Sequence, residues 1–423
     1  MYKIFFFLFL PFFLFSVELK IASYNVENLF DMHLDGTEYE RYIPNQDNWT
    51  ASILTQKLTN ISEVICDIDA DIIGLQEIEN ANALRLLQQS LQEYGCSYPY
   101  AKISKKSNSA IQVALLSKIH IQMSQDIVVS PLWGIRNILE VKLIVDSHPL
   151  YIYVNHWSSK RSPESKRMLS AVALKKRVLE LPKGSAYILL GDFNSDYNEY
   201  VKMKPKHNDT HGKTAINHLL KSIKKEKLLR VSDLEPNSYQ HYNLWLEYAI
   251  YRRWSYNFYG KKEGLDAFLL PYTLFDGKGV DYINGSFSVL KKSYLFHKKG
   301  YIYRWVYKKK RHRGEGYSDH LPVFAKFSTE AYRGSNSAIK YGTILTLHQK
   351  SISLPLLLQR VKVILTEKKR VIIKDKLQTM LIYGINQPLE LGKQYDILVF
   401  KRKLYKGVYE IIDFRVEKRY DGI

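Results

Sequence analysis

The sequence predicts a layered α/β domain followed by a small all-β module. Two observations support this division of the 423-residue chain. Up to residue 327, apolar runs with strand character alternate with longer segments of helical periodicity. After residue 342, short strand-like runs follow one another without a convincing helix. The length is sufficient for one large domain and one smaller one.

The elements of the first part follow from their apolar patterns. Helices are expected where apolar residues recur with helical spacing, at 50–68, 81–94 and 162–181. Strands are expected at the short apolar runs 19–26, 70–78, 111–118, 137–145, 150–157 and 186–193. This mixed order indicates sheets covered by helices.

The N-terminus has the pattern of a secretory signal peptide. Lys3 precedes an apolar block from Ile4 to Phe15, and the small residue Ser16 follows it. The block is too short to cross a bilayer comfortably. We therefore expect a signal peptide at 1–16, with retention as an N-terminal anchor as the alternative. The mature chain is expected to be periplasmic or secreted, without a stable membrane span.

Charge and cysteine content narrow the class of protein. The formal net charge of +20 favours a polyanionic partner, either nucleic acid or an anionic membrane surface, although a basic surface can also serve solubility alone. Cys66 and Cys96 cannot form a disulfide framework or a thiolate metal site. We expect both to be small core residues, with a single bridge as the alternative.

Polar residues stand at the ends of several predicted strands. In GDFNSD, Asp192 and Asn194 occupy alternate positions, so both project from the same side of the strand end. A carboxylate and an amide held there could orient a water molecule and donate to a developing oxyanion, whereas the plainer interpretation is a turn. Similar residues occur in SYNVENLF, LQEIE, VNHWSSK and YSDH, namely Asn25, Glu77, His156, Asp319 and His320.

Taken together and in this order, the motifs resemble the endonuclease/exonuclease/phosphatase family from residue 21 to about residue 327. The resemblance implies a DNase I-like fold, a four-layer α/β sandwich in which two central sheets pack face to face. It also implies that the motifs converge on one edge of the sandwich. NHWSSKR, YNFYGKKEGLDAFLL and the signal peptide further resemble secreted bacterial nucleases.

The resemblance also implies a metal site. Asn25, Glu77 and Asp319 match the positions that hold the ion or the phosphate beside it. Oxygen ligands of this kind suit Mg²⁺, with Mn²⁺ or Ca²⁺ as alternatives.

The catalytic set that the resemblance implies is His156, Asp192, Asn194, Asp266 and His320. Asp192 would orient or deprotonate the water, and Asn194 would donate to the phosphate in the transition state. Asp266 would fix the tautomer of His320. His156 would protonate the leaving group, but Gln112 stands in the strand where its carboxylate partner would be expected.

Several cations are candidates for binding the substrate phosphate. Arg136 matches a phosphate-contacting arginine of the family, and Lys160 and Arg161 follow His156 in a loop. The basic segment 291–313 is expected to form a strand hairpin. Trp245 is expected in the core, and Arg252 with Arg253 at a groove or rim.

The predicted domains are a catalytic domain at 17–330, a linker at 331–342 and a nucleic-acid-binding domain at 343–423. The last contains strand signals at 360–367, 369–375, 378–384, 395–405 and 408–418, which resemble a small OB-like barrel. From residue 335 onward there are about seventeen Lys and Arg against about eight Asp and Glu, which suits phosphate contacts.

The sequence therefore favours a monomeric, metal-dependent nuclease that hydrolyses DNA, with RNA as an alternative substrate. A phosphatase or sphingomyelinase-like phosphodiesterase is the second hypothesis, because the shared residues act on the phosphate and not on what is attached. The third is a non-catalytic nucleic-acid binder with a decayed site. It is the least favoured, because a competent residue occupies each central position that can be matched.

Overall fold

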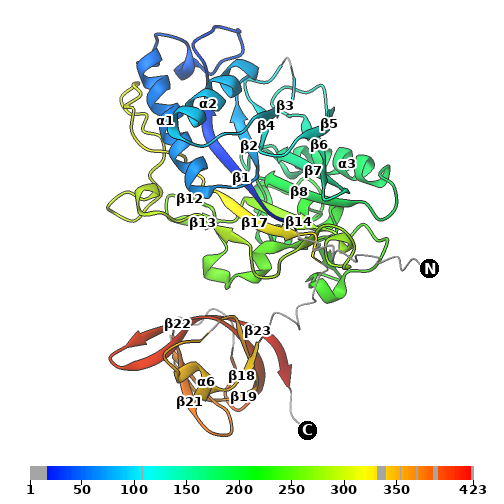
Figure 1. Ribbon diagram of the computed structural model, residues 1–423, viewed down its shortest axis with the longest axis vertical. Helices are drawn as coiled ribbons and strands as arrows, with labels where there is room; N and C mark the ends of the chain where they lie inside the picture. The colour runs from blue at the N-terminus through cyan, green and yellow to red at the C-terminus, as the bar shows by residue number, and fades with distance from the viewer. Residues whose placement is uncertain are drawn as a thin grey trace, which may run out of the picture.

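A computed structural model describes residues 17–106, 108–330, 340–352, 354–367, 370–383 and 389–420 of the protein (Figure 1). The predicted signal peptide and residues 331–339 of the predicted linker lie outside the described residues. No helix in the described ranges is long and apolar enough to cross a membrane.

The first sheet is built around two parallel strands near the N-terminus. β1 (Glu18–Leu29) pairs in parallel with β2 (Ile72–Ile78) and antiparallel with β17 (Val323–Ser328). The sheet continues through β4 (Gln112–Ser117) to β3 (Tyr100–Ile103) on one side. On the other side β17 pairs with β15 (Asp281–Tyr282) and β16 (Ser288–Val289).

The second sheet has the order β11, β14, β8, β7, β6, β5. These strands span Tyr242–Asn243, Asp266–Leu270, Ala186–Asp192, His148–His156, Ile138–Val145 and Ile121–Ile127. β7 and β8 are parallel, whereas β14 runs antiparallel to β8. The register places His156 and Asp266 on either side of Asp192.

The two sheets pack against each other through β1, β2 and β4 of the first and β7, β8 and β14 of the second. Gly74 in β2 lies where they approach closely. A Cβ atom there would stand 2.5 Å from Cδ1 of Leu190 and 3.2 Å from Cγ1 of Val154. A larger residue at 74 would therefore push the sheets apart, and with them the strand ends that carry the polar motifs.

Helices cover the outer faces (Figure 1). α1 (Ala51–Ile68) and α2 (Ala81–Tyr94) contact each other beside the first sheet, and α3 (Glu164–Leu179) contacts β5 of the second. The side chains of Thr50 and Asn80 accept hydrogen bonds from the backbone N–H groups of Ile53 and Ala83, which caps α1 and α2 at their predicted starts.

Cys66 and Cys96 form a disulfide, with Cα atoms 5.7 Å apart. The expectation that both are free core residues is therefore wrong, and the alternative of a single bridge holds. Cys66 lies near the end of α1, whereas Cys96 follows α2 directly. α1 and α2 pack side by side with their C-terminal ends together, which brings the two cysteines into contact over a sequence separation of 30.

The chain between β8 and β14 forms mainly short elements. They include α4 (Glu199–Lys202), β9 (Ile223–Lys224), β10 (Lys227–Leu228), β12 (Tyr256–Phe258) and β13 (Lys261–Glu263). Trp245 is fully buried, which confirms its predicted core position. The hairpin predicted at 291–313 has isolated bridges only, Phe296 with Ile302 and Tyr307 with His312. Its backbone instead bonds to the loop before α1, where the N–H of His312 donates to the carbonyl of Asp47.

The C-terminal region contains a closed barrel with its own apolar core. Among the described residues its strands are β19 (Leu356–Glu367), β20 (Arg370–Lys374), β21 (Thr379–Tyr383), β22 (Gln394–Tyr405) and β23 (Val408–Tyr420). β21 and β23 are parallel, and β22 closes the barrel on β19. These strands match the predicted ones. β18 (Lys340–Gly342) and the short helix α6 (Ile344–His348) precede them and are not predicted.

The barrel contacts the first domain through one edge of β23. The guanidinium of Arg252 pairs with Asp413, and the hydroxyl of Tyr251 donates to the carbonyl of Ile412. Arg415 donates to the carbonyl of Leu246 at 3.4 Å. Arg252 was predicted at a groove or rim, whereas its charge is neutralised at the contact between the domains.

Candidate active site

The sheet registers bring the polar strand ends together. Asp192 ends β8, with His156 of β7 and Asp266 of β14 opposite it in the two neighbouring strands. Gly191, just before Asp192, has a φ of +130°, and a Cβ atom there would lie 2.1 Å from the carbonyl oxygen of Asn155. Only glycine fits this close approach, so the GDFNSD motif holds its carboxylate close against β7.

Asp192 lies at the centre of the site and is 2% exposed. Its Oδ1 accepts a hydrogen bond from the backbone N–H of Asn194 at 2.8 Å, and its Oδ2 accepts from Nδ2 of Asn25 and of Asn194 at 3.2 Å. Nε2 of His156 and of His320 lie 3.6 and 3.9 Å from Oδ2. Burial raises the pKa of Asp192 to about 7, although the neighbouring His320 opposes the rise.

Asn194 adopts a φ of 47° in the turn after β8, a left-handed conformation that asparagine tolerates. Its Nδ2 also donates to the carbonyl of Trp157 at 3.0 Å. The turn predicted as the plainer interpretation of GDFNSD is therefore present, and it is the turn that fixes the side chains of Asp192 and Asn194 beside each other.

Glu77 is aimed by an irregularity in β2. The pairing of β2 with β4 shifts register between Gln76 and Ile78, and Glu77 has a φ of 68°. A bulge of this kind redirects one side chain out of the regular alternation. Oε1 of Glu77 accepts from Nδ2 of Asn25 at 3.1 Å and lies 3.8 Å from Nε2 of His156. Burial and the charge of Asp319 raise the pKa of Glu77.

Asn25 is oriented between the carboxylates. Its Oδ1 accepts from the backbone N–H of Glu27 at 3.0 Å, while its Nδ2 donates to Glu77 and Asp192. In this orientation Asn25 positions the two carboxylates and presents no free oxygen. Asp319, which is one-fifth exposed, lies 3.4 Å from the guanidinium of Arg304.

His320 is held by an acidic partner, as the sequence predicts. Its Nδ1 lies 2.8 Å from Oδ2 of Asp266, which also accepts from Oγ of Ser255 at 2.6 Å. The carboxylates of Asp266 and Asp192 outweigh burial and raise the pKa of His320 well above its ordinary value. An imidazolium directed toward the pocket can donate a hydrogen bond to a phosphate oxygen.

His156 has a different environment. Its Nδ1 is buried and has no hydrogen-bond partner among the described residues, and Gln112 donates instead to the carbonyls of Lys106 and Ser109. Burial and the charge of Arg136 lower the pKa of His156 well below its ordinary value. A neutral His156 can exchange hydrogen bonds with Asp192, but its protonation of a leaving group stays a prediction.

The cations predicted to bind phosphate differ in their availability. Arg136 is buried and donates from Nε to the carbonyl of His156 at 2.9 Å and from a terminal nitrogen to the carbonyl of Trp157 at 2.5 Å. It therefore positions the end of β7, and its predicted contact with phosphate has no support in this geometry. Nζ of Lys160 pairs with Glu199 at 2.6 Å and Glu263 at 2.9 Å, whereas Arg161 is exposed.

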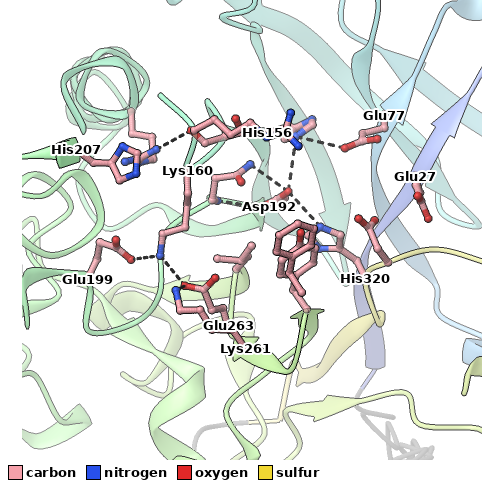
Figure 2. Close-up of a pocket in the computed structure, with 18 of the residues that line it drawn as sticks. Glu27, Glu77, His156, Lys160, Asp192, Glu199, His207, Lys261, Glu263 and His320 are labelled. Carbon is pink, nitrogen blue, oxygen red and sulfur yellow. Dashed lines mark hydrogen bonds and ion pairs between the residues drawn. The ribbon is translucent and has the colours of Figure 1, made fainter. Parts of the chain in front are cut away.

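One pocket, with a cavity volume of about 650 Å³, is lined by the predicted site residues Glu77, His156, Lys160, Arg161, Asp192, Asn194, Asp319 and His320 (Figure 2). In the view of Figure 2, Glu27 and Glu77 lie on one side of Asp192, and Lys160 and His207 lie on the other. The pocket therefore has an acidic end and a basic end with the central carboxylate between them.

The acidic end fits a hard divalent cation. Glu77 and Asp319 supply carboxylate oxygens, the ligands that Mg²⁺ and Mn²⁺ prefer, whereas the oxygens of Glu27 accept from Arg304 and from the backbone N–H of Trp305. Burial, followed by the charge of Asp319, raises the pKa of Glu77, and a bound cation would favour the ionised form of this carboxylate. Asp192, Asp266 and His320, whose ligand-type atoms lie within 4.8 Å of one another, form a second candidate group.

Several residues of the pocket are absent from the sequence prediction. Arg304 pairs with Glu27, the ring of Tyr256 packs against His320 with centroids 4.7 Å apart, and Ser255 donates to Asp266. Glu27 lies within the quoted motif SYNVENLF and could have been singled out. Arg304 comes from an irregular segment and Tyr256 from the three-residue strand β12, and neither is long enough in its pattern to give a signal from spacing or periodicity.

Residues 20–228 match the Endonuclease/Exonuclease/phosphatase family. This match includes Asn25, Glu77, His156 and Asp192, and it supports the family assignment made from the motifs. A search of curated proteins found no match.

Solved structures give similarities of low identity. TDP2 of D. rerio, humanised by 14 mutations, is 15% identical with a TM-score of 0.47, over 73% of this chain and 98% of that chain. Truncated TDP2 of Caenorhabditis elegans is 15% identical with a TM-score of 0.45, over 73% of this chain and 97% of that chain. A family protein of Bacteroides thetaiotaomicron is 16% identical with a TM-score of 0.45, over 74% of this chain and 99% of that chain.

Proposed function

We propose that this chain, whose residues 20–228 match the endonuclease/exonuclease/phosphatase family, is a metal-dependent nuclease that hydrolyses phosphodiester bonds of DNA. The observation that carries the proposal is the composition of the pocket. A buried carboxylate, an ion-paired histidine and an asparagine amide meet between an acidic end suited to a cation and a basic end suited to a polyanion.

Each residue of the site has a separate role in the proposed hydrolysis. Asp192 orients the attacking water and accepts its proton, because its Oδ2 faces the pocket between His156 and His320. The imidazolium of His320 and the amide of Asn194 donate to the phosphate oxygens as negative charge develops on them. Glu77 and Asp319 would hold the ion, and Asn25 fixes the direction of the Glu77 carboxylate. A bound Mg²⁺ or Mn²⁺ ion supplies neutralisation of the phosphate charge.

A secreted or periplasmic location belongs to the same proposal. The predicted signal peptide directs export, and the Cys66–Cys96 disulfide is a bond that forms and persists in oxidising compartments. The bond joins the C-terminal ends of α1 and α2.

We infer that the C-terminal barrel is an OB-like module that binds nucleic acid. Its pairing order β19, β20, β21, β23, β22 with closure on β19 suits a five-stranded barrel of this type within the described residues. Aromatic side chains on it lie next to cations. Arg402 is 3.8 Å from the ring centroid of Tyr409, and Lys406 is 5.6 Å from that of Tyr405. Pairs of this kind contact both bases and phosphates of single strands.

Removal of the barrel should affect binding more than chemistry. Truncation after residue 330 should leave the single-turnover rate on saturating DNA within about threefold, because the pocket residues all precede that point. DNA affinity should fall, and its dependence on salt should become shallower, because fewer phosphates are neutralised. Circular dichroism would establish that the truncated chain folds. Equal affinity with the same salt slope would show that the barrel has another role.

Metal removal tests the acidic end. After dialysis against EDTA, the full chain should lose plasmid-nicking activity, and added Mg²⁺ or Mn²⁺ should restore it, because the carboxylates of Glu77 and Asp319 line this end of the pocket and suit these ions as ligands. Glu77→Gln should raise the Mg²⁺ concentration needed for half-maximal activity by at least about tenfold. Full activity in the metal-free protein would contradict this part of the proposal.

A phosphatase or sphingomyelinase-like activity is the second candidate, because the central residues act on the phosphate alone. The basic end of the pocket disfavours it, since a small headgroup needs no further cations along the wall. Hydrolysis of inositol phosphate or sphingomyelin by the full chain would favour it.

A further inference from the structure

Some cationic side chains at the basic end of the pocket are paired with a carboxylate, and others are not. Lys160, Lys202 and Lys261 are neutralised, because their ammonium groups pair with Glu199, Asp196 and Glu263 at 2.5–2.7 Å. Arg161, Lys204 and Lys206 also line the pocket, and within the described parts of the chain no acidic side chain pairs with them. All three are exposed, so their charge is available to a ligand.

The segment that carries Lys204 and Lys206 is held in place. The carboxylate of Glu199 is buried at its start, where it accepts from the backbone N–H of Asp196 at 2.9 Å and pairs with Lys160. The backbone N–H of Tyr200 donates to Oδ1 of Asn217 at 3.0 Å. The wall of the pocket is therefore built in advance, and binding would require little ordering of the backbone.

The pKa of His207 is affected by the cations around it. Desolvation, followed by the charges of Lys206, Arg167, Lys204 and Lys160, lowers the pKa of His207. The lowered pKa favours the neutral form of His207, so the positive charge at this end of the pocket comes from the lysine and arginine side chains. Figure 2 places His207 and Lys160 on the side of Asp192 away from Glu77, so this positive region is separate from the acidic end.

We propose that Arg161, Lys204 and Lys206 form a second anion subsite, which binds a backbone phosphate next to the phosphodiester that is cleaved. The inference rests on the proposed nuclease function and deepens it. With the scissile phosphate between Asp192 and His320, a polynucleotide would carry its neighbouring phosphates along the pocket toward these cations. Lysine and arginine at such a place bind phosphate without reading the base sequence. The subsite would thus select a chain of phosphodiesters over a substrate that has only one.

The test compares two substrates in the full chain. A dinucleotide has a single phosphodiester, whereas a short oligonucleotide carries flanking phosphates. In the double variant Lys204→Gln/Lys206→Gln, the ratio of kcat/KM for the oligonucleotide to that for the dinucleotide should fall at least about tenfold, mainly through KM. Arg161→Gln should lower the same ratio. The matched control is Lys176→Gln/Lys183→Gln, which removes the same charge from exposed lysines outside the pocket and should leave the ratio unchanged.

A binding measurement separates this proposal from the nuclease function. In EDTA, the affinity of the full chain for a labelled oligonucleotide should fall with Lys204→Gln/Lys206→Gln and not with the control. An unchanged ratio and affinity would overturn the subsite, as would an equal loss in the control variant, which would indicate a general field of charge. If the wild-type chain cleaves no nucleic acid but the variant loses affinity selectively, the nuclease proposal fails while the anion subsite stands.

Discussion

Replacement of Asp192 by asparagine should lower the rate of DNA cleavage by at least about a hundredfold, the scale of lost general-base assistance. The substitution keeps the size of the side chain and an oxygen that can accept from the backbone N–H of Asn194. It removes the carboxylate that takes a proton from the attacking water in the proposed reaction. The rate would be measured under single-turnover conditions with saturating DNA. The loss should appear in the chemical step and not in DNA affinity.

The thermal stability of the Asp192→Asn protein is measured as a control. Asp192 is buried and its pKa is raised to about 7 by burial, so its ionised form is costly in the metal-free protein. Asp192→Asn should therefore fold, with a melting temperature at or above that of the wild type. Exposed Asp233 provides the matched variant, because Asp233→Asn changes the charge equally outside the pocket. Near wild-type cleavage by a folded Asp192→Asn protein would remove the role assigned to this carboxylate.

The second large effect concerns the His320–Asp266 pair. His320→Gln should also reduce turnover at least about a hundredfold, because the imidazolium donates to charge that develops on the phosphate. Asp266→Asn should be milder and should change the pH profile. The Asp266 carboxylate, 2.8 Å from Nδ1, is the main influence that raises the pKa of His320. If the cationic form is active, activity is present below this pKa and lost above it.

The sign of the shift makes the test specific. Removal of the Asp266 charge lowers the pKa of His320, so the alkaline limb of the kcat/KM profile should move to lower pH in Asp266→Asn. Ser255→Ala serves as the matched variant, because it removes a neutral hydrogen bond to the same carboxylate and should move the limb much less. A profile of unchanged shape with a uniformly lower rate would show that Asp266 has only a structural role.

The regular elements could be predicted because their patterns are local. α2 spans the predicted 81–94, and Thr50 caps α1 where the helix was expected to begin. β5, by contrast, is mostly exposed or half-buried at the edge of its sheet, so its apolar signal is weak. The prediction of a strand hairpin at 291–313 was wrong, because aromatic residues of this segment are fixed by contacts with the loop before α1 and not by regular strand pairing. The hydroxyl of Tyr307, for example, donates to the carboxylate of Asp47 in that loop.

For the candidate site, the sequence identifies several of the residues but not the direction of their side chains. The motifs name Asp192, His320 and Asp266, and the structure brings them together, because each lies at or near a strand end on the same edge. The sequence alone could not show that Oδ1 of Asn25 is taken by a backbone N–H, or that Arg136 donates to carbonyl groups and not into the pocket. The choice between ligand, phosphate contact and structural support depends on side-chain direction, which residue spacing does not determine.

The most direct test of the central claim is a comparison of substrates with the mature, full-length protein in Mg²⁺. Supercoiled plasmid, single-stranded DNA and RNA would be incubated beside inositol phosphate and sphingomyelin at matched phosphate concentration. The proposed function predicts cleavage of DNA that EDTA abolishes, with little or no release of phosphate or phosphocholine. Hydrolysis of inositol phosphate or sphingomyelin with plasmid left intact would contradict it and would assign the pocket to the phosphatase or lipid phosphodiesterase class.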